Sequence, residues 1–112
     1  MSAETQEFDD IELSAIRVGA DLLLLITGGV RHIGAASTAF IDGGAVSAGT
    51  TAVPHHKEHT ISEDISRRAA AALNCTVTVV MGIHYDHLSK EGIMQVVRMV
   101  NNKVDQYLAQ QK

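Results

Sequence analysis

The sequence predicts an α+β fold with mixed α/β character. We expect a single domain of four N-terminal strands followed by a helix, a strand and a helix, with one sheet covered by the two helices. Residues 8–53 hold short apolar runs and period-two alternation, separated by glycine-rich turns. Residues 60–73 and 89–104 carry apolar residues at helical spacing, and a β-branched run lies between them at 76–82. Strands therefore come first, and the last strand stands between two helices.

The first two strands are predicted from different patterns. In "FDDIELSAIRV" (8–18), Ile11, Leu13 and Ala15 recur at period two, which is typical of a half-buried strand. "DLLLLIT" (21–27) is a continuous apolar run that ends at two glycines, which favours a strand covered on both faces.

A hairpin is predicted next. "HIGAASTAFI" (32–41) and "AVSAGTTAV" (45–53) are rich in small and β-branched residues, and "DGG" at 42–44 is a turn signal between them. Pro54 ends the second of these strands or marks it as an edge, because proline has no N–H to donate.

The first helix is expected to begin at Thr60. Thr60 and Glu63 have the spacing of a capping box, in which each side chain satisfies a backbone donor. One apolar stripe then recurs every four residues, at Ile61, Ile65, Ala69 and Leu73. Asn74 can close the helix in a left-handed conformation.

The C-terminal part is predicted as strand, loop and helix. "TVTVVMG" (76–82) is a buried strand, and "IHYDH" follows it as a loop. Ser89 is the N-cap candidate of the second helix, with Glu91 in its first turn. The apolar stripe of this helix consists of Ile93, Val96, Val97, Val100 and Val104. Three methionines are expected to fill the core, namely Met81, Met94 and Met99.

Composition excludes several classes of protein. The chain has 112 residues and a formal net charge of −4, so it lacks the basic surface of a nucleic-acid-binding protein. The apolar run at 22–26 is far shorter than the roughly 18 residues of a membrane span. The acidic N-terminus argues against a signal peptide, and residues 1–7 are expected to be flexible. Cys75 is the only cysteine and cannot form a disulfide within the chain, so we expect a cytoplasmic protein. Residues 8–112 are expected to form its single domain.

Three polar clusters lie at ends of predicted strands. The first is "TGGVRHIG" (27–34), where Gly28 and Gly29 permit close approach of a ligand and Arg31 or His32 can pair with an anion. It matches neither the Rossmann nor the P-loop pattern. The alternative is a glycine-rich turn with a solvated arginine.

The second cluster, "PHHKEHT" (54–60), gathers three of the six histidines before a helix. A helix N-terminus attracts anions, so His55, His56, Lys57 and His59 would suit a phosphate or carboxylate. A metal site or a solvated connection are the alternatives, since imidazole also binds metals.

The third cluster, "GIHYDH" (82–87), follows the buried strand at its carboxyl end, where open α/β sheets usually bind ligands. His84 and Asp86 are two residues apart and point the same way if the chain is extended. They could act as a base with its orienting acid or as metal ligands. Alternatively, His84 caps a turn and Asp86 begins the next helix.

These motifs resemble a known family. "ITGG" followed by "HIG", the "HKE" of residues 56–58 and "TVTVVMGIHYDHLSKEGI" are similar to the gallate decarboxylase D-subunit-like proteins. Members are also described as prenylated-flavin chaperones and were earlier labelled amino acid decarboxylases. The resemblance covers roughly residues 20–105.

The resemblance implies a small protein that binds prenylated FMN, or FMN, and delivers it to a UbiD-type decarboxylase large subunit or helps to mature it. That enzyme would act on aromatic or related acids. A flavin prenyltransferase is a further candidate partner, and self-association into a homo-oligomer is expected. Such a chaperone or accessory subunit need not catalyse a reaction itself.

The same resemblance assigns the clusters to parts of the cargo. His56, Lys57 and His59 would hold the phosphate, and His84 and Asp86 would contact the polar edge of the ring. Gly28, Gly29 and His32 would let the backbone approach the ligand. Arg31 stands where a less charged residue is expected.

Two other functions remain open on the sequence. Histidines 32, 56, 59 and 84, together with Asp86, could converge on a metal for hydrolytic or lyase chemistry. The small-residue strands at 32–53 would also suit a purely structural subunit that packs sheet against sheet.

Overall fold

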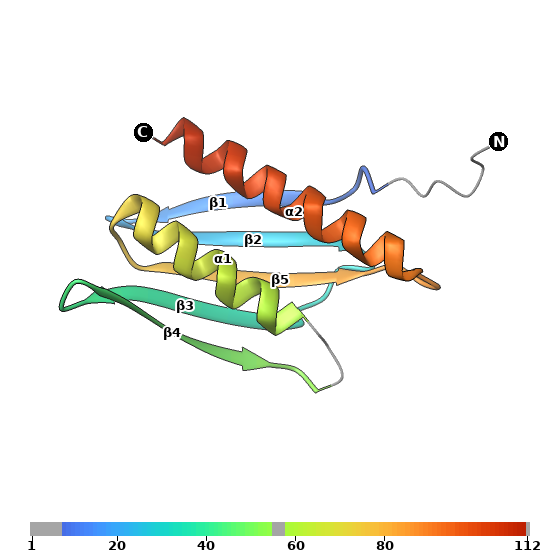
Figure 1. The fold of residues 1–112 in the computed structure, drawn as a ribbon, viewed down its shortest axis with the longest axis horizontal. Coiled ribbons are helices and arrows are strands. Elements are labelled where there is room, and N and C mark those ends of the chain that lie inside the picture. Colours follow the sequence, from blue (N-terminus) through green and yellow to red (C-terminus); the bar gives the residue numbers. More distant parts are fainter. Residues whose placement is uncertain (1–7, 55–57, 112) are drawn as a thin grey trace.

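Two helices lie on one face of a five-stranded sheet, which confirms the predicted α+β class (Figure 1). The computed structural model describes residues 8–54 and 58–111. Its elements are β1 (Glu12–Val18), β2 (Asp21–Gly29), β3 (Ala35–Asp42), β4 (Ala45–Ala52), α1 (Glu58–Leu73), β5 (Val77–His84) and α2 (Lys90–Gln110).

The last strand of the chain lies in the middle of the sheet. The strand order is β1-β2-β5-β3-β4, so β5 is inserted between the two N-terminal hairpins (Figure 1). β5 runs parallel to β2 and antiparallel to β3. The carboxyl ends of β2 and β5 consequently meet at one edge of the sheet, with Gly29 opposite His84.

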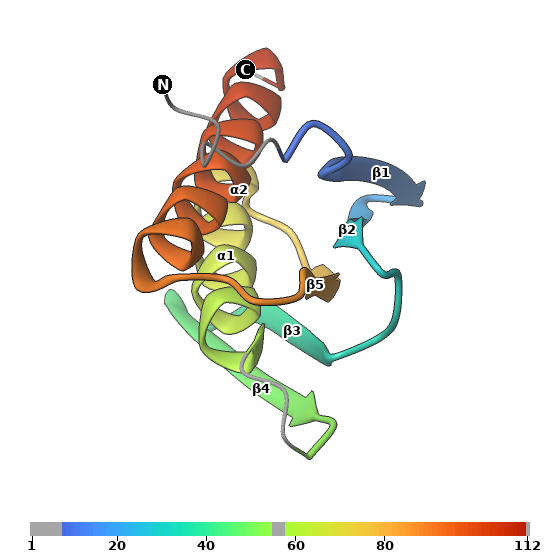
Figure 2. The same ribbon diagram turned by 90° about the vertical axis from the view of Figure 1, so that its right-hand side faces the viewer.

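The core lies between the helices and one face of the sheet. Alternate residues of the central strands point into it, among them Leu24, Ile26, Val79 and Met81. From α2 come Val96, Val100, Val104 and Leu108. Leu25, between Leu24 and Ile26, is 37% exposed, so the prediction that both faces of this strand are covered is wrong within the described residues. The helices cover one face only (Figure 2).

Hydrogen bonds join α1 to the sheet and to α2. Ser37 Oγ lies 2.7 Å from Ser62 Oγ and 2.7 Å from Thr50 Oγ1, and Thr50 donates to the Glu63 carboxylate at 2.8 Å. Because the Thr50 proton goes to the carboxylate, Ser37 donates to Thr50. Arg68 joins the helices, donating to Asp105 at 2.7 Å and to Asn101 at 2.8 Å.

Several local predictions are confirmed. Gly43 and Gly44 have φ of 61° and 84°, as a two-residue hairpin turn requires. Asn74 ends α1 with a positive φ of 54°. The Ser89 side chain accepts the Gly92 N–H and caps α2. Cys75 is partly buried beside the core, and this burial raises the pKa of its thiol.

Element boundaries differ from the prediction in the N-terminal half. β1 begins at Glu12 instead of residue 8, because Phe8 and Ile11 turn into the core before the strand starts. Ala15 is exposed, so the strand is less buried than its alternation indicates. β3 begins at Ala35, three residues after the predicted start at 32.

The boundaries of α1 and β5 also differ from the predicted ones. α1 begins at Glu58, so the predicted capping box at Thr60 is wrong: Glu63 instead bonds Thr50 and Arg67. β5 extends through His84 and includes the first residues of the predicted loop. Met94 is 55% exposed, so the prediction that it fills the core is wrong. Neither helix, in the part of the chain that the structure describes, has the length and apolarity needed to cross a membrane.

Candidate functional site

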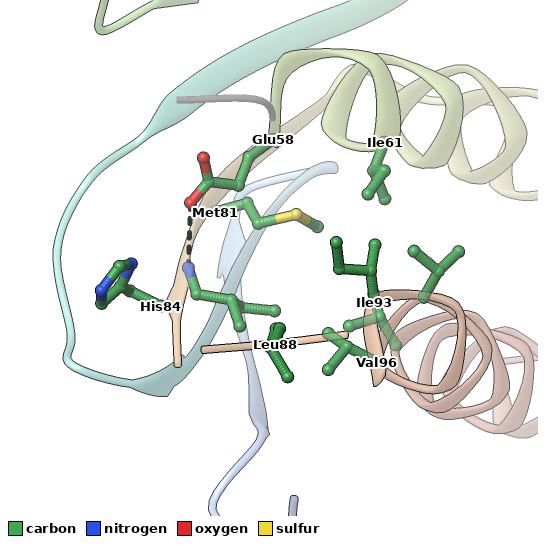
Figure 3. A pocket seen from close by; sticks show the side chains of 10 residues that line it. Glu58, Ile61, Met81, His84, Leu88, Ile93 and Val96 are labelled. Carbon is green, nitrogen blue, oxygen red and sulfur yellow. Dashed lines mark hydrogen bonds between the residues drawn. The ribbon is translucent and has the colours of Figure 1, made fainter. Parts of the chain in front are cut away.

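A pocket of about 240 Å³ opens between α1 and α2 over the carboxyl end of β5. Eight of its lining side chains are apolar and none is aromatic. These are Ile61, Met81, Ile83, Leu88, Ile93, Val96, Val97 and Val100. Glu58 and His84 are the polar members, and they lie toward one end while Ile61, Ile93 and Val96 lie toward the other (Figure 3). The pocket therefore offers an aliphatic surface with a polar end.

The pocket lies above the end of β5, between the start of α1 and the first half of α2. Val96 and Val100 are buried and hold the middle of α2 against the core. One turn earlier, Ile93 is 52% exposed, since no residue of the described chain fills the space beneath it. The apolar stripe of α2 therefore lines the pocket at its start, with Ile93, and packs into the core further along, with Val104.

Glu58 is a buried acid at the start of α1. Its Oε2 accepts the Ile83 N–H at 3.1 Å and lies 3.0 Å from His32 Nε2. Pairing of β3 with β5 extends only to Ala35 opposite Met81, so the next N–H on that side of β5 has no strand partner. The Glu58 carboxylate takes the place of that partner, since a buried N–H left without an acceptor is costly.

Two glycines make room for this arrangement. A Cβ on Gly34 would lie 2.6 Å from Glu58 Oε1, and one on Gly82 would lie 1.7 Å from the His32 carbonyl oxygen. Any side chain at either position would displace the acid or the His32 backbone. The connection between β2 and β3 is therefore closely fitted to β5 and to the first turn of α1.

A second histidine lies at the same edge of the sheet. His84 Nε2 is 3.0 Å from Asp86 Oδ1, so these two side chains are in contact. Their side chains are 52% and 76% exposed. The centroids of the His32 and His84 rings are 6.5 Å apart. The first polar cluster (27–34) and the third (82–87) therefore meet at this edge.

A third polar group lies beside them, on the β1 side. Tyr85 donates its hydroxyl proton to Asp10, and the Gly29 N–H donates to the same carboxylate at 3.0 Å. The Tyr85 hydrogen bond holds the pKa of Asp10 below its usual value of 3.8. Burial and the Asp10 carboxylate raise the pKa of Tyr85 well above 10.0. Phe8 packs against the Tyr85 ring at 4.8 Å and closes this corner.

The predicted glycines are enclosed by the chain itself. A Cβ on Gly28 would lie 2.9 Å from Ile11 Cγ1 and from the Tyr85 hydroxyl. Gly29 has a φ of +64°, and its Cβ would lie 2.0 Å from the His84 carbonyl oxygen. Packing within the chain thus requires both glycines, and their contact with a ligand stays a prediction.

The remaining predicted residues have different surroundings. Arg31 pairs with Glu12 at 2.6 Å and is 66% exposed. His59 is the second residue of α1 and lines a separate polar depression with Glu63 and Arg67. His56 and Lys57 lie outside the described residues.

Sequence reasoning missed Glu58 and the apolar lining. Glu58 is the last residue of the "HKE" motif and has no assigned role in the predicted site, although its place directly before an apolar stripe is a signal that it could point inward. The lining residues appear as ordinary core positions of two helices and a strand. Their exposure to a pocket depends on the angle between the helices, which no local pattern encodes.

Metal ligation gains no support from the described geometry. Across residues 8–54 and 58–111, no group of three or more His, Cys, Asp or Glu side chains is arranged to hold a metal ion. His32 and His84 approach each other, but their polar neighbours are Glu58 and Asp86 on different sides.

The chain matches a known protein family. The family model of the prenylated flavin chaperone LpdD-like domain matches residues 5–112. No curated protein matches the chain. The matched segment spans nearly the whole sequence and includes every residue of the pocket.

Proposed function

The chain belongs to the family of LpdD-like prenylated flavin chaperones, and from this premise we propose that it binds prenylated FMN and delivers it to a UbiD-type decarboxylase. Prenylated FMN has a hydrocarbon-rich end, a polar pyrimidine edge and a phosphate. A carrier needs a surface for each of these parts. It must also release the cargo, so its grip should be moderate.

The observation that carries the proposal is the aliphatic pocket with its polar end. Aliphatic side chains gain about 25 cal/mol for each Å² of apolar surface that a ligand buries against them. Ile61, Ile93 and Val97 are the surface against which the hydrocarbon-rich end would lie. His84 would face the polar edge of the ring, with Asp86 orienting its imidazole.

Among the described residues, no Phe, Tyr or Trp side chain lines this pocket, which fits a carrier. Ring stacking adds about 0.5–1.5 kcal/mol beyond the burial of area. A site that lacks such stacking holds a flavin by burial of its apolar end and by polar contacts. Transfer to the decarboxylase then requires breaking fewer specific contacts.

The phosphate is proposed to lie at the start of α1. His56, Lys57 and His59 supply donors and positive charge next to the free N–H groups of the first turn. Gly28, Gly29 and His32 belong to the same edge of the sheet and complete the proposed site. Arg31 lies further out, against Glu12, and contributes at most long-range attraction for the phosphate.

We further propose that the chain self-associates, acts in the cytoplasm and serves a decarboxylase of aromatic acids, of which a gallate decarboxylase is the model. A flavin prenyltransferase would supply the cargo. Each of these proposals extends the family assignment and is testable in a reconstituted system.

Native mass spectrometry of the protein co-produced with a flavin prenyltransferase, under anaerobic conditions, tests the proposal. The expected result is an adduct with the mass of prenylated FMN that is reduced in the Lys57→Ala and His59→Ala variants. Arg98→Ala, on the exposed surface of α2, is the control and should keep the adduct. A wild-type protein without any flavin adduct would contradict the proposal.

A further inference from the structure

One face of the sheet is bare. Both helices lie on the opposite face, and no described element covers this one (Figure 2). The register assigns to it the outward residues of all five strands, with Ile16, Leu23 and Thr78 in one row and Leu25, Val80 and Ala36 in the next. We call this surface the open face.

The open face is apolar at its centre, unlike a sheet face that water covers. Ile16 is 48% exposed, Leu25 37% and Phe40 40%. Two of its three inner strands, β2 and β5, are parallel to each other, and all-parallel sheets are normally covered on both faces. The run "LLLLI" of β2 is apolar on both faces of the strand, although only one of these faces is covered within the described chain. It therefore also indicates that another surface covers the open face.

The two halves of the open face differ in bulk. On the β1–β2 side the outward residues at its centre are large, with Ile16, Leu23 and Leu25. On the β3–β4 side the residues in the same two rows are small, with Thr38 opposite Gly49. Phe40, nearer the hairpin turn, is the large residue on that side. β5 separates the two halves. In these two central rows the surface is therefore complementary in shape to a copy of itself turned over about an axis along β5.

We propose that a second copy of this chain packs on the open face, with a two-fold axis along β5. Leu23 and Leu25 of one copy then lie over the small residues of β3 and β4 of the other, and the two β5 strands face each other. Aligned sheets pack about 10 Å apart, with their mean strand directions within about 30° of each other. An axis of this kind uses the same patch on both copies, as two-fold dimers do.

The area is sufficient for a stable dimer. Five strands about 4.8 Å apart and eight residues rising about 3.3 Å each give a face on the order of 600 Å² in projection. Side chains and pleating make the accessible area larger than its projection. It thus approaches the roughly 800 Å² per partner of a standard interface.

Charge does not oppose this contact. The ionisable side chains that the register places on the open face lie near the strand ends, at Glu12, Asp21 and Asp42. The register also assigns His84 to this face, at the carboxyl end of β5, where the pocket opens. The rows through Leu23 and Leu25 contain only apolar and hydroxyl-bearing residues and glycine. The proposal specifies the surface for the self-association proposed above, and it stands whether or not the chain binds a flavin.

Light scattering after size exclusion tests the proposal on the full chain. The wild type should have twice the chain mass of 12.0 kDa, and Leu25→Lys should reduce it to one chain mass, because the charge would be buried at the interface. Met94→Lys places the same charge on α2, away from the open face, and should remain a dimer. A monomeric wild type, or a Leu25→Lys variant that stays dimeric, overturns the proposal.

Cross-linking keeps the proposal testable if Leu25→Lys fails to fold. In a Cys75→Ser background, Val80→Cys places a thiol on β5 near the axis, so a short bis-maleimide should join two copies. Val18→Cys lies at a corner of the same face, far from its counterpart, and should react without cross-linking. Equal cross-linking of both variants, or none of Val80→Cys, overturns the proposed axis.

Discussion

The Glu58 carboxylate lies 3.0 Å from His32 Nε2, which joins the first turn of α1 to the connection between β2 and β3. The same oxygen accepts the Ile83 N–H from β5 at 3.1 Å. A single buried acid thus holds three separate segments together at the mouth of the pocket. Its removal should affect the shape of the pocket as well as the stability of the fold.

Glu58→Ala should lower the free energy of unfolding by about 1–3 kcal/mol, because the Ile83 N–H loses its acceptor. Glu58→Gln keeps an acceptor oxygen and should cost less. Urea denaturation measures both. Asp64→Ala, at an exposed ion pair of the same helix, is the control and should cost less than about 1 kcal/mol. Equal losses for Glu58→Ala and Asp64→Ala would contradict the bridging role.

Ile93→Ala should weaken binding of prenylated FMN roughly tenfold, because a half-exposed isoleucine loses about 1.4 kcal/mol of burial against the ligand. Folding stability should barely change, since Ile93 is 52% exposed without ligand. Met94→Ala is the matched control, a neighbour with 55% exposure that does not line the pocket. Anaerobic titration of the flavin absorbance gives both affinities. Indistinguishable values would exclude this pocket as the binding surface.

Tyr85→Phe should change the pH dependence of stability at both ends. The pKa of Asp10 is lowered in the fold, so its contribution is present above pH 3.8 and lost as the pH falls through the folded value. The pKa of Tyr85 is raised, so its contribution is present below pH 10.0 and lost at higher pH. The variant should show a flatter stability profile in both ranges, measured by urea denaturation. Tyr107→Phe should leave the acid range as in the wild type.

Thr50→Val should raise the pKa of Glu63 toward its usual 4.5, because the Thr50 hydroxyl is the main cause of its lowering. A lowered carboxyl pKa stabilises the fold above the unfolded value and ceases to do so as the pH falls through the folded one. The stability gap between wild type and variant should therefore narrow below pH 4.5. NMR titration of the Glu63 carboxyl carbon measures the shift, and Thr51→Val, with its side chain on the open face, should not change it.

The secondary structure could be predicted because local patterns decide most of it. The Ser89 cap, the Asn74 terminus and the glycine turn at 43–44 each depend on the residue's own conformational preference. The start of α1 could not be predicted from such a rule. Although Thr60 has a favourable capping pattern, the helix begins at Glu58, because Glu58 forms tertiary hydrogen bonds with His32 and Ile83.

The candidate site could be predicted only in part, for a similar reason. The polar clusters are visible as strand ends, and His84 does contact Asp86 as its spacing indicates. The meeting of His32 with His84 depends on β2 and β5 being parallel neighbours, which the order of elements along the chain does not determine. The pocket depends on how α1 and α2 pack over the end of β5, a property of packing between distant segments.

The position of β5 has a consequence for synthesis of the chain. On the ribosome, β2 and β3 emerge well before β5, at roughly 5–20 residues per second. Their inner edges remain unpaired until residues 77–84 arrive and insert between them. The nascent chain therefore holds two hairpins whose inner strands, β2 and β3, have unpaired edges, and such edges can pair with other chains. Substitutions that delay entry of β5 should thus lower the soluble yield even when the finished protein is stable.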